Sequence, residues 1–265
     1  MYAFTYHRAS GLRQAGNLLG KLEDAKLLAG GQTLLPTMKQ RLASPANLID
    51  LGAVEGMSGI ELKGRSLVIG ALTKHYEVAN SPVVQESMPA LAALAGMIGD
   101  PAVRHRGTIG GSLANNDPNA DYPAAALGLG ATIVTSKRKI LADDFFKGLF
   151  ETALEPDEII VKVSFPVAKK AGYYKFRNQA SRFALVGVFV AKKPSEIRVA
   201  VTGAGASGVF RVPSFEEALK KRFSPKSLEG LTVPADGLAG DIHGSAEYRA
   251  HLIGVCARRA VEAAG

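Results

Sequence analysis

Apolar positions in the first two thirds of the chain switch repeatedly between helical and strand spacing. Leu12, Ala15, Leu18, Leu19 and Leu22 recur with the i, i+3, i+4 period, which predicts the buried face of an amphipathic helix. Shorter apolar runs bounded by Gly, Pro or Ser predict strands. In chain order the pattern predicts helices at about 10–22, 34–42, 74–79, 89–98, 122–129 and 143–149, and strands at about 1–7, 26–29, 47–51, 59–63, 66–69, 131–136 and 158–165.

Beyond Gly172 the pattern changes to consecutive strands with no helix between them. Residues 173–179, 183–191 and 196–202 alternate or run apolar, which predicts a three-stranded antiparallel sheet. Helices at about 214–221 and 246–263 follow, separated by a loop rich in Pro and Gly. We therefore expect an α+β protein with an N-terminal domain at 1–168, divided into subdomains at about 1–55 and 56–168, and a C-terminal domain at 172–265.

Composition restricts the class of protein and its compartment. The 265 residues are 47% hydrophobic and 21% charged, which is enough for a substantial core. Apolar runs such as 185–191 are too short to span a bilayer, and the chain opens without a basic-then-apolar leader, so we expect a cytoplasmic protein. The single cysteine, Cys256, excludes an internal disulfide and any cysteine-ligated iron–sulfur cluster held by this chain alone.

The formal charge of +8 raises the question of nucleic-acid binding. The Lys and Arg residues come as scattered pairs in expected turns, and no basic strand carries interleaved aromatic residues. A solvated surface explains most of these charges. A basic surface that docks acidic partner subunits is favoured over binding to nucleic acid.

Two glycine-centred segments carry the clearest chemical signal. They read Ala29-Gly-Gly-Gln-Thr-Leu-Leu-Pro36 and Thr108-Ile-Gly-Gly-Ser-Leu-Ala-Asn115. Paired glycines allow close approach to the main chain, and successive exposed N–H groups form a concavity that binds anions. Neither segment matches a Walker A loop or the G-x-G-x-x-G fingerprint. Either alone is more often a structural turn, whereas the two together predict a cradle for the diphosphate of a dinucleotide.

Other motifs typical of catalytic or metal sites are absent. The five histidines show no H-E-x-x-H or H-x-H spacing, so no metal site is expected. The chain has no G-x-S-x-G elbow, which disfavours a nucleophilic hydrolase. Glycine loops without acid–base machinery indicate a cofactor that carries the reaction itself.

Four motifs occur in the order found in one family. These are the two glycine segments, the second extended at its start by Arg104-His-Arg-Gly107, followed by Asn115-Asn-Asp-Pro-Asn-Ala-Asp121 and Leu154-Glu-Pro-Asp-Glu-Ile-Ile160. Together they resemble the FAD-binding (medium) subunit of the molybdenum hydroxylases, of the carbon monoxide dehydrogenase type, which is similar to the flavin domain of xanthine dehydrogenase. The resemblance covers essentially the whole chain. It implies a two-part FAD-binding domain of the PCMH type, made of two small α/β subdomains, followed by a C-terminal flavoprotein domain.

The resemblance also implies a set of residues around a non-covalently bound FAD. The first loop would wrap the pyrophosphate and ribityl chain, the second would complete the phosphate cradle, Asn115 would lie nearby, and Asp121 would hold the adenosine or ribose end. Ile160 would contact the adenine side, Lys175 would approach the flavin ring, and Ile98 would lie beside the isoalloxazine. The loop residues are Ala29, Gly30, Gly31, Gln32, Thr33, Leu34, Leu35 and Pro36 in the first, and Thr108, Ile109, Gly110 and Gly111 in the second. Read without the resemblance, Asp121 is equally well a helix N-cap, and Asn115 a turn residue.

The function implied by the resemblance is that of an electron-transfer subunit. Electrons would reach FAD from an iron–sulfur small subunit and a molybdenum-cofactor large subunit, in a dimer of heterotrimers, and would leave to quinone, NAD or oxygen. Two alternatives remain at this point: a stand-alone FAD oxidoreductase of the same superfamily, such as a cell-wall precursor reductase, and a binding protein without a cofactor. A stand-alone reductase would need a proton donor in the C-terminal domain, where the sequence shows no candidate.

Overall fold

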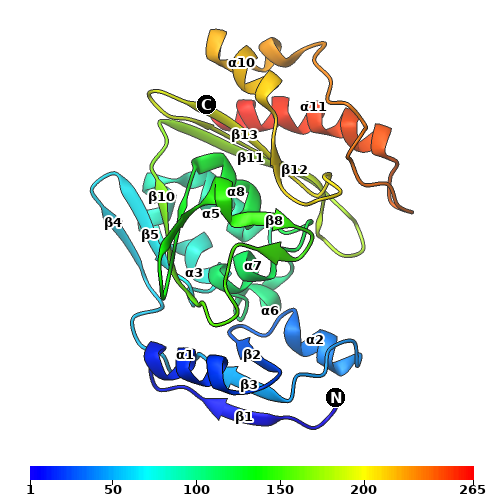
Figure 1. Ribbon diagram of the computed structural model, residues 1–265. Helices are drawn as coiled ribbons and strands as arrows, with labels where there is room; N and C mark the ends of the chain where they lie inside the picture. The colour runs from blue at the N-terminus through cyan, green and yellow to red at the C-terminus, as the bar shows by residue number, and fades with distance from the viewer.

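Three sheets with their own helices follow one another along the chain in the computed structural model, which describes all 265 residues (Figure 1). The first forms the lower lobe of Figure 1 and is fully parallel, with strand order β1-β3-β2. Its elements are β1 (Thr5–Arg8), α1 (Leu12–Lys21), β2 (Ala25–Leu28), α2 (Leu34–Lys39) and β3 (Asn47–Asp50). Because β2 lies at the edge of this sheet, the glycine loop that follows it emerges at the rim of the lobe.

The second sheet is five-stranded and antiparallel, with strand order β4-β5-β10-β6-β7. A run of short helices is inserted between β5 and β6, and the second glycine segment lies within that run. The elements are β4 (Ile60–Lys63), β5 (Ser66–Gly70), α3 (His75–Asn80), α4 (Pro82–Ser87), α5 (Pro89–Gly96), α6 (Pro101–Arg104), α7 (Ile109–Asn115), α8 (Tyr122–Leu129), β6 (Thr132–Thr135), β7 (Lys139–Leu141), α9 (Ala142–Phe145), β8 (Phe146–Gly148), β9 (Glu151–Thr152) and β10 (Ile160–Pro166).

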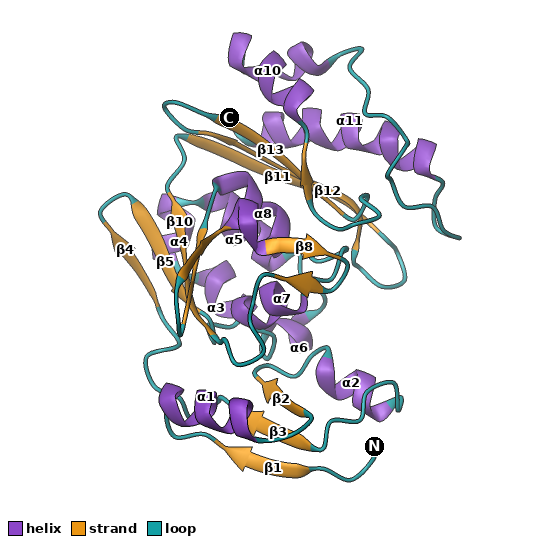
Figure 2. Ribbon diagram, in the orientation of Figure 1, coloured by secondary structure: helices purple, strands orange, loops and turns teal.

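The C-terminal sheet lies between helices on both of its faces (Figure 2). Helix α11 covers one face, and α8 and α5 pack against the other. The core accordingly has two parts, one on each side of this sheet. The elements are β11 (Lys170–Arg177), β12 (Ala184–Lys192), β13 (Ile197–Thr202), β14 (Phe210–Arg211), α10 (Pro213–Lys221), a 3₁₀ turn (Pro225–Leu228) and α11 (Ala246–Ala263).

The expected order of helices and strands is confirmed, with several local corrections. The C-terminal sheet has four strands rather than three, because the two-residue β14 pairs with β13. The helix expected at 143–149 ends at Phe145, and 146–148 instead forms β8 against β9. The second glycine segment is not a loop, because Ile109 to Asn115 form α7. The pattern also failed to predict α4, α6 and β7, which are too short for their periodicity to stand out. No helix is both long and apolar enough to cross a bilayer.

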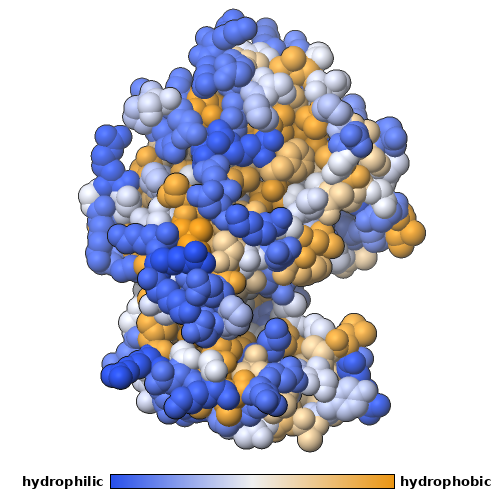
Figure 3. Space-filling model, in the orientation of Figure 1, coloured by the Kyte–Doolittle hydropathy of each residue, from blue (hydrophilic) through white to orange (hydrophobic).

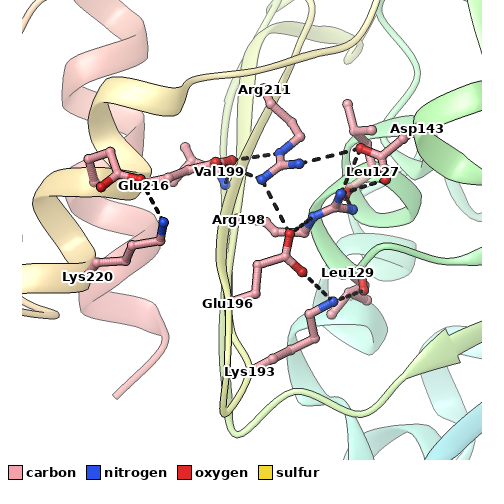
Figure 4. A network of polar contacts seen from close by, with 11 residues as sticks. Leu127, Leu129, Asp143, Lys193, Glu196, Arg198, Val199, Arg211, Glu216 and Lys220 are labelled. Atoms are coloured by element: carbon pink, nitrogen blue, oxygen red, sulfur yellow. Dashed lines mark hydrogen bonds and ion pairs between the residues drawn. The ribbon is translucent and has the colours of Figure 1, made fainter.

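A charged network joins the C-terminal sheet to the helices beneath it (Figure 4). The Arg198 guanidinium donates to the carbonyl of Leu127 at 2.7 Å and forms an ion pair with Asp143 at 2.5 Å. Arg211 bridges from the same carboxylate, at 3.5 Å, to Glu216, at 2.7 Å. Since Arg198 is almost fully buried, its partners on α8 and α9 are needed to satisfy its charge, which fixes the sheet relative to these helices.

Candidate functional site

One cleft of about 990 Å³ lies between the N-terminal lobe and the rest of the molecule. Figure 3 shows the molecule hollowed on the right-hand side between these two parts. Both glycine segments line the cleft, together with residues 98–100, the segment 150–160 and the turn between β11 and β12. Its volume is at the upper end of the range of about 300–1,000 Å³ that is usual for small-molecule sites, which suits a ligand as large as a dinucleotide.

The first glycine loop presents an open row of main-chain donors. The N–H groups of Gly30, Gly31, Gln32, Thr33 and Leu34 have no hydrogen-bond partner in the protein, and the next bond is that of the Leu35 N–H to the Gly31 carbonyl. Gly31 has φ +72°, a backbone conformation that favours glycine. Successive unpaired N–H groups leading into a helix start form an anion-binding concavity.

The second glycine segment differs, because its amides are already used inside the protein. The Ile109 and Gly110 N–H groups donate to the carbonyls of Thr73 and Ala71, at 3.1 and 2.8 Å. The Gly111 N–H donates to Oγ1 of Thr108, the N-cap of α7, at 3.2 Å. The expectation that both segments expose runs of N–H groups is therefore wrong for residues 109–111.

The two segments nevertheless lie side by side, as a shared cradle requires. A Cβ placed on Gly30 would overlap the Arg106 carbonyl and would lie 2.7 Å from Cα of Gly107. A Cβ on Gly111 would lie 3.9 Å from Cβ of Ala29. Gly30 is thus required for the contact between the segments, whether or not a ligand is bound.

A buried ion pair forms part of the cleft wall where it meets the C-terminal sheet. Lys175 Nζ lies 2.9 Å from Asp121 Oδ2, with side chains that are 1% and 3% exposed. The Tyr173 hydroxyl donates to Asp121 Oδ1 at 2.5 Å, and Lys175 also donates to the Met97 carbonyl at 3.2 Å. Asp121 does occupy the N-cap position of α8, as the alternative expected, but its carboxylate makes no cap hydrogen bond to that helix.

Burial also perturbs two further groups in the cleft wall. His75 is 5% exposed, and burial, with a smaller effect of the Arg104 charge, lowers its pKa to about 4. Its Nδ1 has no partner, nor does the hydroxyl of Tyr122, whose ring centroid is 5.3 Å away. Burial raises the pKa of Asp117, and the backbone N–H of Asn119 partly offsets this. His75 is therefore a neutral structural support near pH 7 rather than a cation that would face a diphosphate.

The cleft brings together most of the residues expected from the sequence. Fourteen of them line it: Ala29, Gly30, Gly31, Gln32, Thr33, Leu34, Ile98, Thr108, Gly110, Gly111, Asn115, Asp121, Ile160 and Lys175. Leu35, Pro36 and Ile109 do not. Ile109 is fully buried in the core, Pro36 is exposed outside the cleft, and the Leu35 side chain lies behind Gly31.

Several residues that line the cleft were not expected from the sequence. His75, Gly107 and Asp117 line the cleft, as does the turn Ala180–Phe183 between β11 and β12. Gly107 carried a signal, since it lies four residues before Gly111 in the same motif. The turn carried none, because only the packing of the C-terminal sheet brings it to this cleft.

Comparison with known proteins agrees with this geometry. Residues 2–168 match the family described as "FAD binding domain in molybdopterin dehydrogenase". The carbon monoxide dehydrogenase medium chain of Hydrogenophaga pseudoflava is 36% identical over 98% of this chain and 96% of its own length. The nicotine 6-hydroxylase medium subunit of Paenarthrobacter nicotinovorans is 38% identical over 99% and 98% of the two chains.

Solved structures give the same result for the fold over the whole chain. Carbon monoxide dehydrogenase from Hydrogenophaga pseudoflava matches with a TM-score of 0.87 and 36% identity, covering 99% of this chain and 97% of that one. Quinoline 2-oxidoreductase from Pseudomonas putida 86 matches with a TM-score of 0.88 and 28% identity, covering 99% and 97%. The chain therefore belongs to the FAD-binding medium subunits of the molybdenum hydroxylase family, of the carbon monoxide dehydrogenase type, and is an FAD-dependent oxidoreductase subunit.

Proposed function

We propose that this chain is the flavin subunit of a three-component complex and passes electrons from iron–sulfur clusters to an external acceptor. Its partners would be an iron–sulfur small subunit and a molybdenum-cofactor large subunit, assembled as a dimer of heterotrimers. Support comes from the relatives, which match over nearly their whole lengths and are named as medium chains or subunits. A stand-alone reductase is disfavoured for the same reason. We also propose a cytoplasmic location, where the free, buried Cys256 would stay reduced.

The observation that carries the cofactor assignment is the open row of amides at Gly30–Leu34 beside the second glycine segment. These N–H groups would donate to the diphosphate, and because the adjacent α2 is short, the direct hydrogen bonds matter more than a helix dipole. Asn115 and Thr108 would supply side-chain contacts at the same end of the cleft. FAD, once bound, supplies the capacity to accept and release electrons.

The remaining lining residues would orient and enclose the cofactor. Ile98 and Ile160 provide apolar walls, and the Asp121–Lys175 pair provides a donor and acceptors at the junction with the C-terminal sheet. Leu35, Pro36 and Ile109 would act indirectly, by holding the two glycine segments in place. The domain limits at 1–168 and 172–265 belong to this proposal, with the cofactor bound mainly by the first domain and the cleft completed by the second.

A co-purification experiment tests the proposal. The tagged full chain, expressed with its partners, is expected to yield a yellow complex with a flavin absorbance, containing iron and molybdenum in addition to FAD. Titration of FAD into the isolated chain then shows whether the cleft retains the cofactor without partners. A tagged chain that recovers no iron- or molybdenum-containing partner contradicts the subunit assignment. Absence of FAD from both the complex and the isolated chain contradicts the cofactor assignment.

A further inference from the structure

The C-terminal sheet contacts the cleft wall through one row of residues on adjacent strands. Lys175 on β11, Gly187 on β12 and Thr202 on β13 are in register across the sheet. Lys175 reaches Asp121, and the Thr202 hydroxyl lies 2.9 Å from the Pro118 carbonyl and 2.7 Å from the Ala120 carbonyl. The row therefore holds both the backbone of segment 118–121 and the carboxylate at its end.

The glycine in this row makes room for a second group that reaches the carboxylate. A Cβ on Gly187 would overlap the Tyr173 hydroxyl and would lie 2.9 Å from the Thr202 methyl. Tyr173, two residues before Lys175 on the same face of β11, is 6% exposed, and its ring packs beside Phe189 with centroids 6.1 Å apart. Its hydroxyl passes over Gly187 to Asp121 Oδ1. Tyr173 does not itself line the cleft, whereas Asp121 and Lys175 do.

Asp121, Tyr173 and Lys175 have different roles in this arrangement. An ionised carboxylate removed from water needs hydrogen bonds to remain stable. Tyr173 satisfies one oxygen of Asp121, and Lys175 satisfies the other. The Lys175 ammonium has three donors, two of which are used by Asp121 and the Met97 carbonyl, so one is left for a ligand next to Ile98.

We propose that Tyr173 is a positioning residue for cofactor binding, because its hydroxyl holds the Asp121 carboxylate in the orientation that keeps Lys175 at the cleft. This inference rests on the proposed binding of FAD in this cleft. Tyr173 acts from behind the wall, through Asp121, and contacts no ligand.

The expected signature is a pH-dependent loss of affinity. Burial raises the pKa of Asp121, while Lys175, Tyr173 and the Arg177 charge act in the opposite direction. The other titratable group beside this carboxylate is Tyr122, the first residue of α8, whose pKa is itself raised by burial. Without the Tyr173 hydroxyl the ionised carboxylate loses a donor, so Asp121 takes up its proton at a higher pH and releases Lys175.

The test compares Tyr173→Phe with Tyr174→Phe in the full chain, or in its complex if the isolated chain does not retain FAD. Tyr174 is adjacent on the opposite face of β11, where its hydroxyl contacts Arg259, so the control removes the same atom away from the cleft. We expect FAD affinity to fall about 10-fold or more in Tyr173→Phe, the loss typical of one hydrogen bond to a charged group. The acid limb of the affinity profile should move to higher pH, while Tyr174→Phe should match the wild type in both respects.

A double-mutant cycle separates positioning from general destabilisation. If Tyr173 acts through Asp121, then Tyr173→Phe should change FAD affinity little in an Asp121→Asn background. Equal affinity and an unshifted acid limb in Tyr173→Phe, in a wild type that does bind FAD, would overturn the inference and leave the proposed function intact. An effect of Tyr173→Phe that is equally large in the Asp121→Asn background would overturn it as well. A wild type that binds no FAD, alone or in its complex, would instead overturn the proposed function.

Discussion

The two glycine segments are similar in sequence but have different roles in the structure. Residues 30–34 leave their N–H groups open to the cleft, whereas residues 109–111 donate theirs to Thr73, Ala71 and Thr108. The difference follows from their surroundings: the first emerges at the rim of a small sheet, and the second is packed in a run of helices over the central sheet. One segment is a binding surface, and the other is mainly the support against which that surface rests.

The largest effect is expected for Gly30→Ala, which breaks the contact between the segments. Its Cβ would overlap the Arg106 carbonyl, and overpacking of this kind costs about 1–3 kcal/mol. We expect FAD affinity, measured by fluorescence titration, to fall on the order of 100-fold, which corresponds to the upper end of that energy range. Gly16→Ala is the matched control, because its Cβ meets nothing within 4 Å in α1. Unchanged FAD affinity in Gly30→Ala would show that FAD binding does not depend on the contact between the two segments.

Acidic pH should lower the stability of the folded protein through His75, which contacts the start of the second glycine motif. Its backbone N–H donates to the Gly107 carbonyl, and its pKa is lowered from 6.5 to about 4 by burial. The unfolded chain therefore binds the proton more readily, so the stability is fully present above pH 6.5 and is lost as pH falls towards 4, by up to about 3 kcal/mol. Urea unfolding at pH 7 and pH 4.5 measures this, and His75→Asn should show a smaller pH difference. An equal pH difference in the variant would assign the effect to other groups.

Gly110→Ala should act on stability rather than on ligand approach. A Cβ at this position would lie 2.6 Å from Cβ of Ala71 and 2.8 Å from its carbonyl oxygen. We expect the ligand-free chain to lose about 1–3 kcal/mol in urea unfolding. A variant with unchanged stability but lost FAD affinity would show that this segment binds the cofactor directly and is not mainly a support.

The smallest effect is expected for Gly111→Ala, which projects towards the cleft from an exposed position. Its nearest neighbours would be Thr108 Oγ1 at 3.0 Å and Ala29 at 3.9 Å. Thermal unfolding should change by no more than about 1 kcal/mol, the typical contribution of the N-cap bond at Thr108 that this Cβ would crowd. FAD affinity should fall less than in Gly30→Ala. A loss as large as that of Gly30→Ala would assign the two segments equal parts in binding.

Periodicity was sufficient to predict the long elements, whereas the glycine motifs and their order predicted the general site. The apolar face of α1, the hairpin of β4 and β5 and the strands β11 to β13 follow local rules, which depend on neighbours close in sequence. The short elements α4, α6 and β14 were not predicted, because fewer than two turns of helix or two strand residues carry no measurable period. Fourteen expected residues line the cleft because the motif order reflects a shared fold.

By itself, the sequence determined the order of elements, the positions of the glycines and the ligand class that bare amides suit. Only the tertiary structure decided which backbone N–H groups remain free. In the second segment these groups donate to the carbonyls of Ala71 and Thr73, which come from a distant part of the chain. The tertiary structure also decided that the carboxylate of Asp121, the N-cap residue of α8, bonds to Lys175 and Tyr173 rather than to the N–H groups of that helix, since a buried carboxylate requires the donors that packing brings to it.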